Sequence, residues 1–355
     1  MAEFNLDAYN LGSVDLDGVI HEDVMDTIFD IDPVDLPFHD LVGRETADNM
    51  YKSWVKDSLE PVQLADAQID GADMMELPAT ESGDETVAQM ARIGNHHQIS
   101  TRKVKVSHRA RNVDTIGYAD ALIYQLMQRQ KELRRACETT AVSPQASVEA
   151  TDTVAPKTAG AAAMFETNII NGTAGGFAAG IFSAPTPGAA AALTETMIRD
   201  AGELAYNEGG NPTKLMTVPK VIRKLSEYLF SSSARIGTLQ TNISQGSVKE
   251  GEYGHQGVTA VGSVNVIVTD FQTLEFVPNR SQLTYDNGGT QCADVLILDP
   301  EFWAISYLSG FETDELAKTG LSDKRLMSVD WTVISKQEKA SAIIMGIDPT
   351  LAVTA

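Results

Sequence analysis

Residues Thr101–Arg135 read TRKVKVSHRARNVDTIGYADALIYQLMQRQKELRR and combine two patterns. The first eight residues alternate, with Val104 and Val106 on one side and basic residues on the other, which predicts a strand with one buried face. From Asp114 or Thr115, either of which can cap a helix, apolar residues recur at helical spacing. This spacing predicts a helix over residues 115–138, a rod of ~36 Å at ~1.5 Å per residue. A long strand followed by a long helix is therefore the predicted centre of the fold.

Charge is distributed unevenly around this centre. Residues 1–91 contain 22 Asp and Glu against 3 Lys and Arg, whereas residues 92–111 contain 6 Lys and Arg and no acid. The whole chain has a net charge of −22, which argues against a protein that reads nucleic-acid sequence. Segregated charge gives attraction, register and orientation to two protein surfaces that meet. The distribution therefore favours assembly with other chains over catalysis by a lone enzyme.

The N-terminal residues are predicted to form an arm. A short helix is expected over Glu22–Asp30, and an extended path over Ile31–Gly43, because Pro33 and Pro37 disfavour a helix there. Phe38 supplies an apolar anchor in this path. Such a segment has little core of its own, so we expect it to lie on another surface.

A two-stranded flap is predicted next. A strand within Asn49–Leu59 is expected to pair with the strand over Thr101–His108, and the polar, Gly-interrupted residues 60–98 connect them. Isolated hairpins are marginally stable in water. A flap of this length is therefore expected to need a neighbour to lie on.

The C-terminal part has a compact mixed pattern that follows a loop-like, Ala- and Gly-rich stretch over residues 141–187. It begins with a helix over Thr194–Glu208, a strand over Leu215–Val218 and a helix from Pro219 to Phe230. The remaining predicted elements are strands over Val258–Asp270, Leu274–Val277 and Val295–Leu298, a helix over Glu301–Tyr307, and a closing hairpin of Met327–Ser335 with Ala340–Ile347.

The sequence offers no convincing catalytic or metal site. His96 and His97 are adjacent, so in a strand they point to opposite sides, and no further ligand stands at metal-binding spacing. Cys137 and Cys292 are too few and too far apart for a disulfide framework, and His255 lies alone among glycines. We therefore predict no catalytic residue, no metal and no cofactor. The start of the chain lacks signal-peptide features, and no apolar run is long enough for a membrane span, so we expect a soluble protein that is not exported.

The order of these parts resembles the major capsid protein family of tailed bacteriophages, which has the Johnson fold. The resemblance is carried by HEDVMDTIFDIDPVDLPF (His21–Phe38), the strand at Tyr51–Trp54, Thr101–Arg135 as quoted above, and LMTVPKVIRKL (Leu215–Leu225). It implies an α+β fold with an N-terminal arm (1–45), an E-loop flap with flanking strands (46–110), a P-domain (111–193) with its spine helix at 115–138, an A-domain (194–323) and C-terminal P-domain strands (324–355).

The resemblance also implies a function. Copies of the chain would form the hexamers and pentamers of an icosahedral head that encloses double-stranded DNA without sequence-specific binding. The implied partners are a separate scaffolding protein, a portal and a possible cement protein, with assembly in the host cytoplasm and no membrane. Some members of this fold crosslink through a flap lysine, but no lysine lies between Lys56 and Lys103, so we expect non-covalent contacts here.

The charge pattern suggests which residues join the subunits. We expect acidic arm residues, with one apolar anchor, to meet the basic strip of another subunit. The proposed contacts are Asp23, Asp26, Asp30, Asp32, Asp35 and Phe38 on the arm, and Arg102, Lys103, Lys105, Arg109 and Arg111 on the strip.

Three alternatives remain open on the sequence. An encapsulin-type nanocompartment shares the fold and would hold enzyme cargo instead of DNA. A cytosolic α/β hydrolase or transferase would rest only on Thr194–Leu308 and lacks a nucleophile with a base. A tail or fibre protein usually shows β-repeats, and this sequence has none.

Overall fold

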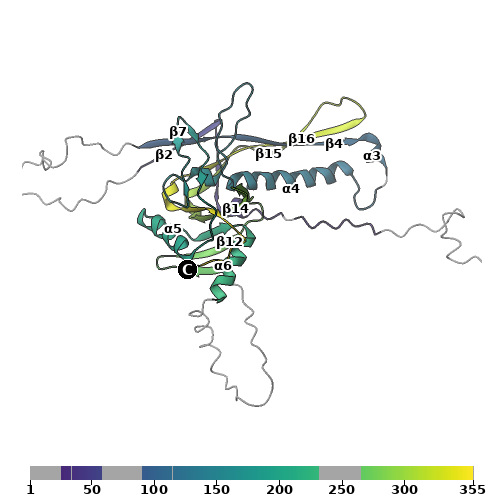
Figure 1. The fold of residues 1–355 in the computed structure, drawn as a ribbon. Coiled ribbons are helices and arrows are strands. Elements are labelled where there is room, and N and C mark those ends of the chain that lie inside the picture. Colours follow the sequence, from purple (N-terminus) through teal and green to yellow (C-terminus); the bar gives the residue numbers. More distant parts are fainter. Residues whose placement is uncertain (1–24, 33, 58–89, 114, 232–264, 355) are drawn as a thin grey trace, which may run out of the picture. The chain divides into compact units, whose positions relative to one another are not determined.

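The structure is a computed structural model that describes residues 25–32, 34–57, 90–113, 115–231 and 265–354 (Figure 1). The chain divides into two compact units. The first comprises Met1–Val34, Arg102–Lys131 and Thr313–Met327, and the second comprises Asp35–Thr101, Glu132–Glu312 and Ser328–Ala355. Helices and strands mix in the order expected of an α+β protein. The five-segment division given above is of a different kind and stays a prediction.

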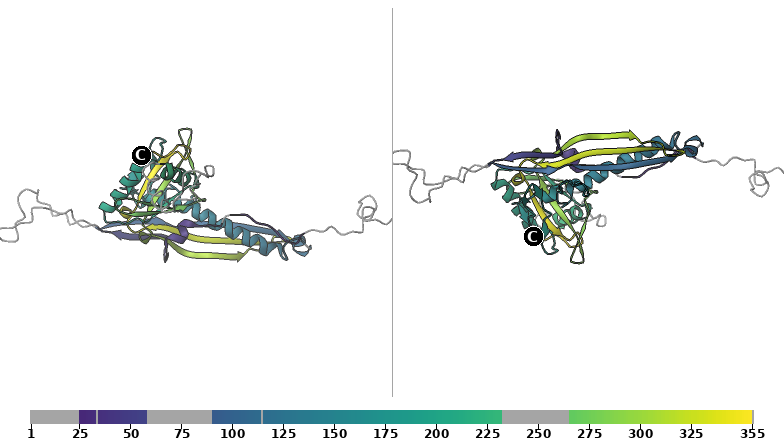
Figure 2. Two further views of the ribbon diagram at one scale, coloured as in Figure 1. Left: turned by 90° about the horizontal axis from the view of Figure 1, so that it is seen from below. Right: turned by 90° about the horizontal axis from the view of Figure 1, so that it is seen from above.

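Four long elements are each divided between the two units. They are β4 (Gln98–Ser107), α4 (Ala121–Val142), β15 (Trp303–Glu315) and β16 (Ser322–Ser335). The three strands join the short β1 (Gly43–Thr46) in a four-stranded sheet of order β1-β15-β16-β4, whose long strands run side by side in Figure 2. Strand β1 is parallel to β15, with Gly43 opposite Ala304 and Thr46 opposite Tyr307.

The first unit has a small core. Val104 and Val106 of β4 pack with Ala121 and Leu122 of α4, and Tyr118 and Leu126 lie against this cluster. The alternation of β4 buries only these two of its side chains here, as predicted from the sequence. A short helix, α3 (His108–Asn112), follows β4, and the side chain of Ser107 accepts a hydrogen bond from the Ala110 amide as its cap.

The long central helix is confirmed, but its predicted start is wrong. Helix α4 begins at Ala121 instead of near Thr115, because Gly117 adopts a φ of +85°, which interrupts helical backbone. A Cβ at Gly117 would lie 2.4 Å from Cγ1 of Ile28, so the close approach of the arm also requires glycine. The Asp120 carboxylate accepts from the Leu122 amide at 2.8 Å and caps the helix, which continues to Val142.

The second unit is built on a seven-stranded sheet of order β11-β12-β10-β14-β17-β5, with β13 paired to β14. Helices α5 (Glu195–Asn207) and α6 (Pro219–Ser231) pack against it through one apolar cluster that includes Ile198, Leu225 and Ile297. The predicted helices at these positions are confirmed. The strands of this sheet are β5 (Ile169–Ile170), β10 (Lys214–Thr217), β11 (Val266–Val268), β12 (Thr273–Pro278), β13 (Tyr285–Asn287), β14 (Thr290–Leu298) and β17 (Ala342–Ile347).

The loop-like stretch before this unit's helices is mostly irregular, with small pieces of structure. These are η2 (Ala161–Met164), β6 (Gly172–Thr173), β7 (Phe177–Ala178), β8 (Ile181–Phe182) and β9 (Thr186–Pro187). The strand predicted over Val258–Asp270 is found only as β11, and residues 258–264 lie outside the described residues.

Two C-terminal predictions are wrong. The expected closing hairpin does not form, because β17 pairs with β14 and β5 whereas β16 lies in the four-stranded sheet. Every residue of β17 is buried, which is typical of a strand in a sheet covered on both faces and not of an exposed closing hairpin. The helix expected over Glu301–Tyr307 is instead a short turn, η3 (Pro300–Phe302), followed by β15, whose residues Trp303–Ser306 are buried on both faces. A further short turn, η4 (Glu338–Ala340), precedes β17.

The partner predicted for the flap strand is wrong. Strand β2 (Tyr51–Lys56) pairs antiparallel with β3 (Ala91–His96), with Tyr51 opposite His96, and not with β4. Strand β3 was not predicted because its sequence is polar. Its Asn95 side chain is nevertheless buried, and it bonds to Thr158 and to backbone carbonyls inside the fold. The tip of the flap, residues 58–89, lies outside the described residues.

The arm also differs from its prediction. Residues 25–30 contain no helix, and residues 22–24 and Pro33 lie outside the described residues. Pro37, which was expected to exclude a helix, instead begins α2 (Pro37–Leu41). A proline in the first turn costs no hydrogen bond, because the amides of that turn have no partner within the helix.

Candidate inter-subunit surface

The predicted basic strip is largely exposed. Arg102, Lys103 and Lys105 of β4 and Arg109 of α3 all face solvent, and we call these four residues the basic ridge. Among the described residues, neither Lys103 nor Lys105 forms an ion pair. The positive charges of these two lysines are therefore available to a partner. The side chains of Val104 and Val106 pack in the core of the first unit and hold the strand there.

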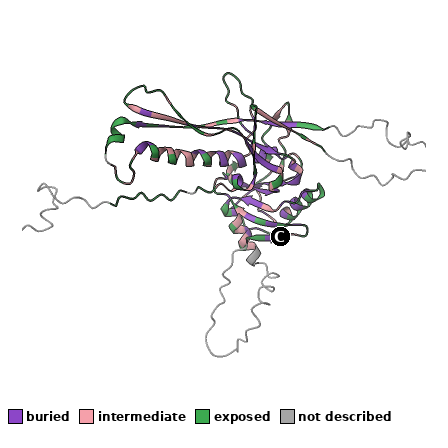
Figure 3. Ribbon diagram, turned by 180° about the vertical axis from the view of Figure 1, so that it is seen from behind, coloured by how far each residue is buried: buried purple, intermediate pink, exposed green. Residues whose placement is uncertain are grey.

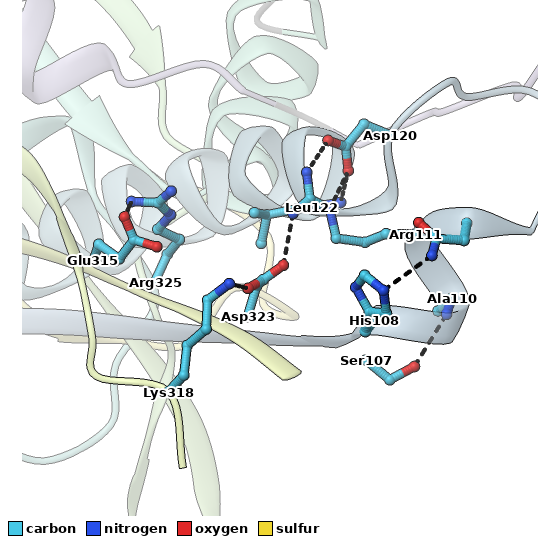
Figure 4. Close-up of polar contacts among 11 residues, drawn as sticks. Ser107, His108, Ala110, Arg111, Asp120, Leu122, Glu315, Lys318, Asp323 and Arg325 are labelled. Atoms are coloured by element: carbon cyan, nitrogen blue, oxygen red, sulfur yellow. Dashed lines mark hydrogen bonds and ion pairs between the residues drawn. The ribbon is translucent and has the colours of Figure 1, made fainter. Parts of the chain in front are cut away.

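Arg111 has a different role in the structure. Its guanidinium bonds to the Asp120 carboxylate at 2.8 Å and to the Asp323 carboxylate at 2.6 Å (Figure 4). Lys318 also pairs with Asp323, at 2.7 Å, and together Lys318 and Arg111 lower the pKa of Asp323 to about 2. Arg111 thus ties α3 to the start of α4 and to β16 within its own chain.

Two of the predicted arm acids are likewise bound within the first unit. The Asp26 carboxylate accepts from the Gly117 amide at 2.5 Å. The Asp30 carboxylate accepts from the Gln128 amide group and from the Lys131 ammonium, each at 3.0 Å, and these bonds hold the pKa of Asp30 far below its usual value. These contacts attach residues 26–30 to the unit that contains the start of α4.

The same arm leaves apolar side chains uncovered. Phe29 is 80% exposed and Ile31 is 98% exposed, and the segment that holds them is coloured as exposed in Figure 3. Asp32 is exposed as well, and its carboxylate has no ion pair among the described residues. Leu321, elsewhere in the same unit, is 86% exposed. So many large exposed side chains on a unit with a small core are typical of a surface that another protein covers.

The other predicted arm residues have separate positions. Asp35 approaches Arg280 at 3.8 Å, and both side chains are mostly exposed, so the pair is weak. Phe38 is fully buried in its own chain, where its ring meets the Trp303 ring edge-on at 6.2 Å between centroids. Asp23 lies outside the described residues. Their roles between subunits stay predictions.

A buried carboxylate that the prediction missed holds the end of the arm. One oxygen of Glu138 accepts from the Phe38 amide at 2.7 Å and from the Asn279 side chain at 2.8 Å. The other oxygen accepts from the His39 amide at 3.1 Å and lies 2.5 Å from Nδ1 of the His39 ring. Glu138 therefore fixes α2 by its first amides. A charged residue at the end of the apolar stripe of α4, next to Cys137, was the available signal.

A pocket adjoins α2 within the second unit. It has a cavity volume of about 520 Å³ and is lined by residues of α2, β1, β15 and the second half of α4. Its wall includes Arg44, Arg134, Tyr307 and Phe311, and the Arg134 guanidinium lies 5.3 Å from the centre of the Phe311 ring. Nothing in the sequence brings these four residues together, because the sheet that does so is formed by distant segments.

The described residues contain no candidate metal centre and no helix long and apolar enough to cross a membrane. Of the adjacent histidines, His97 is buried, both of its ring nitrogens lack hydrogen-bond partners, and burial lowers its pKa to about 4. Burial also raises the pKa of Asp294 to about 6, and this carboxylate accepts from the Tyr285 hydroxyl at 2.6 Å and the Gly346 amide at 3.2 Å. Both groups lie inside the second unit.

Comparison with known proteins identifies the relatives of this chain. A model of the family described as SU10 major capsid protein matches residues 3–348. The major capsid protein of Escherichia phage Phieco32 is 29% identical over 119 residues, which are 34% of this chain and 32% of that protein. The chain thus aligns with about a third of that relative's length.

Solved structures share the fold. The capsid protein of a native GTA particle has a TM-score of 0.55 at 11% identity, with 94% of this chain and 97% of that chain covered. The cyanophage Pam1 capsid gives 0.52 at 12% identity, with 97% and 98% covered. The SrpI encapsulin of Synechococcus elongatus PCC 7942 gives 0.53 at 9% identity, with 93% and 94% covered. At such identities the likeness shows the fold alone, and it confirms the fold predicted from the sequence.

Proposed function

The chain belongs to the SU10 major capsid protein family, and from this membership we propose that it is the major capsid protein of a phage head. Copies of the chain assemble into a closed shell, and the role is structural rather than enzymatic. The observation that carries this proposal is the family match over nearly the whole chain. The first unit supports it, because that unit buries a small core yet leaves Phe29, Ile31 and Leu321 almost fully exposed.

The finer form of the proposal follows the family. Hexamers and pentamers tile an icosahedral shell around double-stranded DNA, with a scaffolding protein, a portal and a possible cement protein as further partners. The net charge of −22 means that the enclosed DNA is contained rather than gripped, because a negatively charged wall repels phosphates. The protein is then part of the virion capsid.

We propose that the basic ridge joins neighbouring subunits. Lys103 and Lys105 carry positive charge on one exposed strand, and the arm of a neighbouring copy brings the acidic residues around Asp23. Asp26, Asp30 and Arg111 have their bonds within the chain, so their part in the interface is to position the arm and the ridge. Asp32 is exposed and has no ion pair among the described residues, which leaves its carboxylate available to a neighbouring copy.

Electron microscopy of the expressed protein tests the shell itself. Closed particles are expected. A compact single subunit at high concentration, with its arm protected from protease, would refute the proposal. Particles that contain enzyme instead of DNA when isolated from infected cells would favour an encapsulin-like role.

The ridge is tested separately with the double variant Lys103→Glu and Lys105→Glu. We expect few or no closed particles, because two positive charges on one exposed strand become negative, which lowers the net charge by four units. Lys157→Glu with Lys220→Glu, two exposed lysines elsewhere, makes the same change in net charge and is the matched control. Normal particles from the ridge variant would exclude the pairing.

A further inference from the structure

We propose that the pocket beside α2 binds a phosphate dianion, either free phosphate or the phosphate end of a small ester. All of the residues that line this pocket belong to the second unit of one copy, so the proposal goes beyond the shell function and does not depend on it. The cavity of about 520 Å³ is within the ~300–1,000 Å³ that is typical of sites for small molecules.

One face of the four-stranded sheet brings most of the binding groups together. Strand β1 is parallel to β15 with Thr46 opposite Tyr307, and Arg44 stands two residues before Thr46 on the same strand. Because successive side chains of a strand point to opposite faces, these three side chains share one face. Phe311 stands four residues after Tyr307 on β15, and the two rings lie 6.3 Å apart between centroids. Arg134 reaches the same place from α4, with its guanidinium 5.3 Å from the centre of the Phe311 ring.

The polar groups of this pocket have donors to spare. Among the described residues, the guanidiniums of Arg44 and Arg134 form no ion pair, and the hydroxyls of Thr46 and Tyr307 form no hydrogen bond. An arginine presents its N–H groups as a planar fork that fits the oxygens of a phosphate, and a hydroxyl can donate one more bond. Two forks and two hydroxyl groups can therefore donate to one ligand.

Electrostatics shows that the two arginines act at one point. Burial raises the pKa of Tyr307, whereas Arg44 and Arg134 act against this rise. Each guanidinium is therefore close enough to the Tyr307 hydroxyl to stabilise a negative charge there. An anion beside that hydroxyl would feel both positive charges.

Positive charge also exceeds negative charge along the lining. Asp40 is the one acid that lines the pocket, against Arg44 and Arg134. The His39 ring, which also lines it, has Nδ1 placed 2.5 Å from the Glu138 carboxylate behind it. The chain as a whole has a net charge of −22, so this is a local reversal of sign. A concave site with one sign of charge concentrates small ions of the opposite sign.

The arrangement of the donors favours phosphate over a carboxylate. The donors come from α4, β1 and β15, so they approach a bound anion from several directions. A tetrahedral phosphate has oxygens in several directions, whereas a carboxylate has two oxygens in one plane. A phosphate monoester also has a charge of about −1.5 to −2 at pH 7, which two guanidiniums can balance.

The walls of the pocket are held in place without a ligand. Helix α2 is fixed by the four hydrogen bonds of Glu138, and β1 is held in register on β15. Arg134 already lies over the Phe311 ring. Binding therefore spends little free energy on ordering the site.

Isothermal titration calorimetry of the purified full-length chain in phosphate-free buffer tests the site. Inorganic phosphate and deoxyadenosine monophosphate are the probes, and saturable binding of at least one of them is expected. Arg44→Gln and Arg134→Gln should each weaken binding by about tenfold or more, because each removes charged hydrogen bonds to the ligand. Tyr307→Phe, which removes only the hydroxyl group, should weaken binding by about threefold.

Arg223→Gln is the matched control. Arg223 is an exposed arginine on α6 that does not line the pocket, and the substitution makes the same change in net charge. Binding should stay within about twofold of the unmodified chain, because charges at the surface are screened by salt. Weakening by Arg223→Gln equal to that by the two pocket variants would show general attraction by charge and would overturn the site.

The remaining outcomes separate the two sources of phosphate. Tighter binding of deoxyadenosine monophosphate than of inorganic phosphate would identify an ester as the ligand, and equal binding would identify free phosphate; both support the site. No saturable binding of either probe would overturn it, as would binding of deoxyadenosine as tight as that of its monophosphate. Closed particles from a chain that binds no phosphate would remove the site and leave the shell function intact, so the two failures are distinguished.

Discussion

Replacing Glu138 by Gln should release α2 from the rest of the second unit. One carboxylate oxygen serves Phe38 and Asn279, and the other serves the amide and ring of His39. Glutamine keeps the oxygen that accepts from Phe38 and Asn279, and it places an NH₂ group where the amide and the ring of His39 had a carboxylate oxygen. The His39 ring can change tautomer and accept from that nitrogen, but the backbone N–H of His39 then has no acceptor.

The cost can be worked from these bonds. A buried donor without an acceptor costs ~1–3 kcal/mol, and two bonds that lose the negative charge of their acceptor become weaker. We therefore expect Glu138→Gln to lower the free energy of unfolding by about 3 kcal/mol, or roughly a hundredfold in the folding equilibrium. Helix α2 should detach first, because two of the four bonds are to its opening amides.

Tryptophan fluorescence during urea denaturation measures this effect. Trp303 and Trp331 are fully buried, and their rings lie 6.2 Å from Phe38 and 6.0 Å from His39, so detachment of α2 changes their surroundings. Variants must be compared at one protomer concentration, because assembly adds stability. Glu203→Gln, at an exposed site, should change stability by less than ~0.5 kcal/mol. An equally small effect of Glu138→Gln would refute the view that this carboxylate anchors the arm.

Three further predictions concern other parts of the chain. Gly117→Ala should detach residues 26–30 and make the arm sensitive to limited proteolysis, because its Cβ would meet Ile28 at 2.4 Å and φ is +85°; unchanged cleavage would contradict this. Burial raises the pKa of Asp294 from 3.8 to about 6. The contribution of this carboxyl group to the free energy of unfolding is therefore fully present below pH 3.8 and is lost as the pH rises to 6. Burial lowers the pKa of His97 from 6.5 to about 4, so its stabilisation is complete above pH 6.5 and is lost as the pH falls to 4. Between pH 4 and 6, Asp294→Asn should therefore make stability rise more steeply with pH, and His97→Gln should make stability rise less steeply or fall. Urea midpoints measured across this range give the slope of stability against pH for each variant. Equal slopes for the two variants would be inconsistent with these pKa shifts. Denaturing gels of mature particles should show monomer only, since no lysine lies between Lys56 and Lys103, and a ladder under reducing conditions would disprove this expectation.

The fold was predictable where local patterns agree with the final packing. The alternation at Val104 and Val106 and the spacing along α4 predicted the strand and, apart from its start, the helix, because each pattern reflects a single buried face. The position of strand β17 was also predicted, but its pairing partner was predicted wrongly. Two apolar runs close in sequence suggest a hairpin, whereas β16 and β17 lie in different sheets, and β17 is buried on both faces.

The surface was harder to predict than the fold. The exposed lysines of β4 were identified from alternation with valines, which is a local signal. The partners of Asp26, Asp30 and Arg111 depend on a glycine turn and on residues more than two hundred positions apart, such as Arg111 and Asp323. Charge counting shows that opposite charges will meet, and it cannot show whether they meet within one chain or between two.

A single residue, His97, separates β3 from β4, so the backbone of the flap continues into the long strand without a loop. Extended backbone is already close to its maximum length of ~3.3–3.6 Å per residue and can hardly stretch further. A tensile force on β3 is therefore transmitted directly to β4, because no loop between the two strands can extend. In a shell under outward pressure from its contents, each subunit would behave as a tie rod, and the strength of the wall would depend on sheet hydrogen bonds as much as on the seams between subunits.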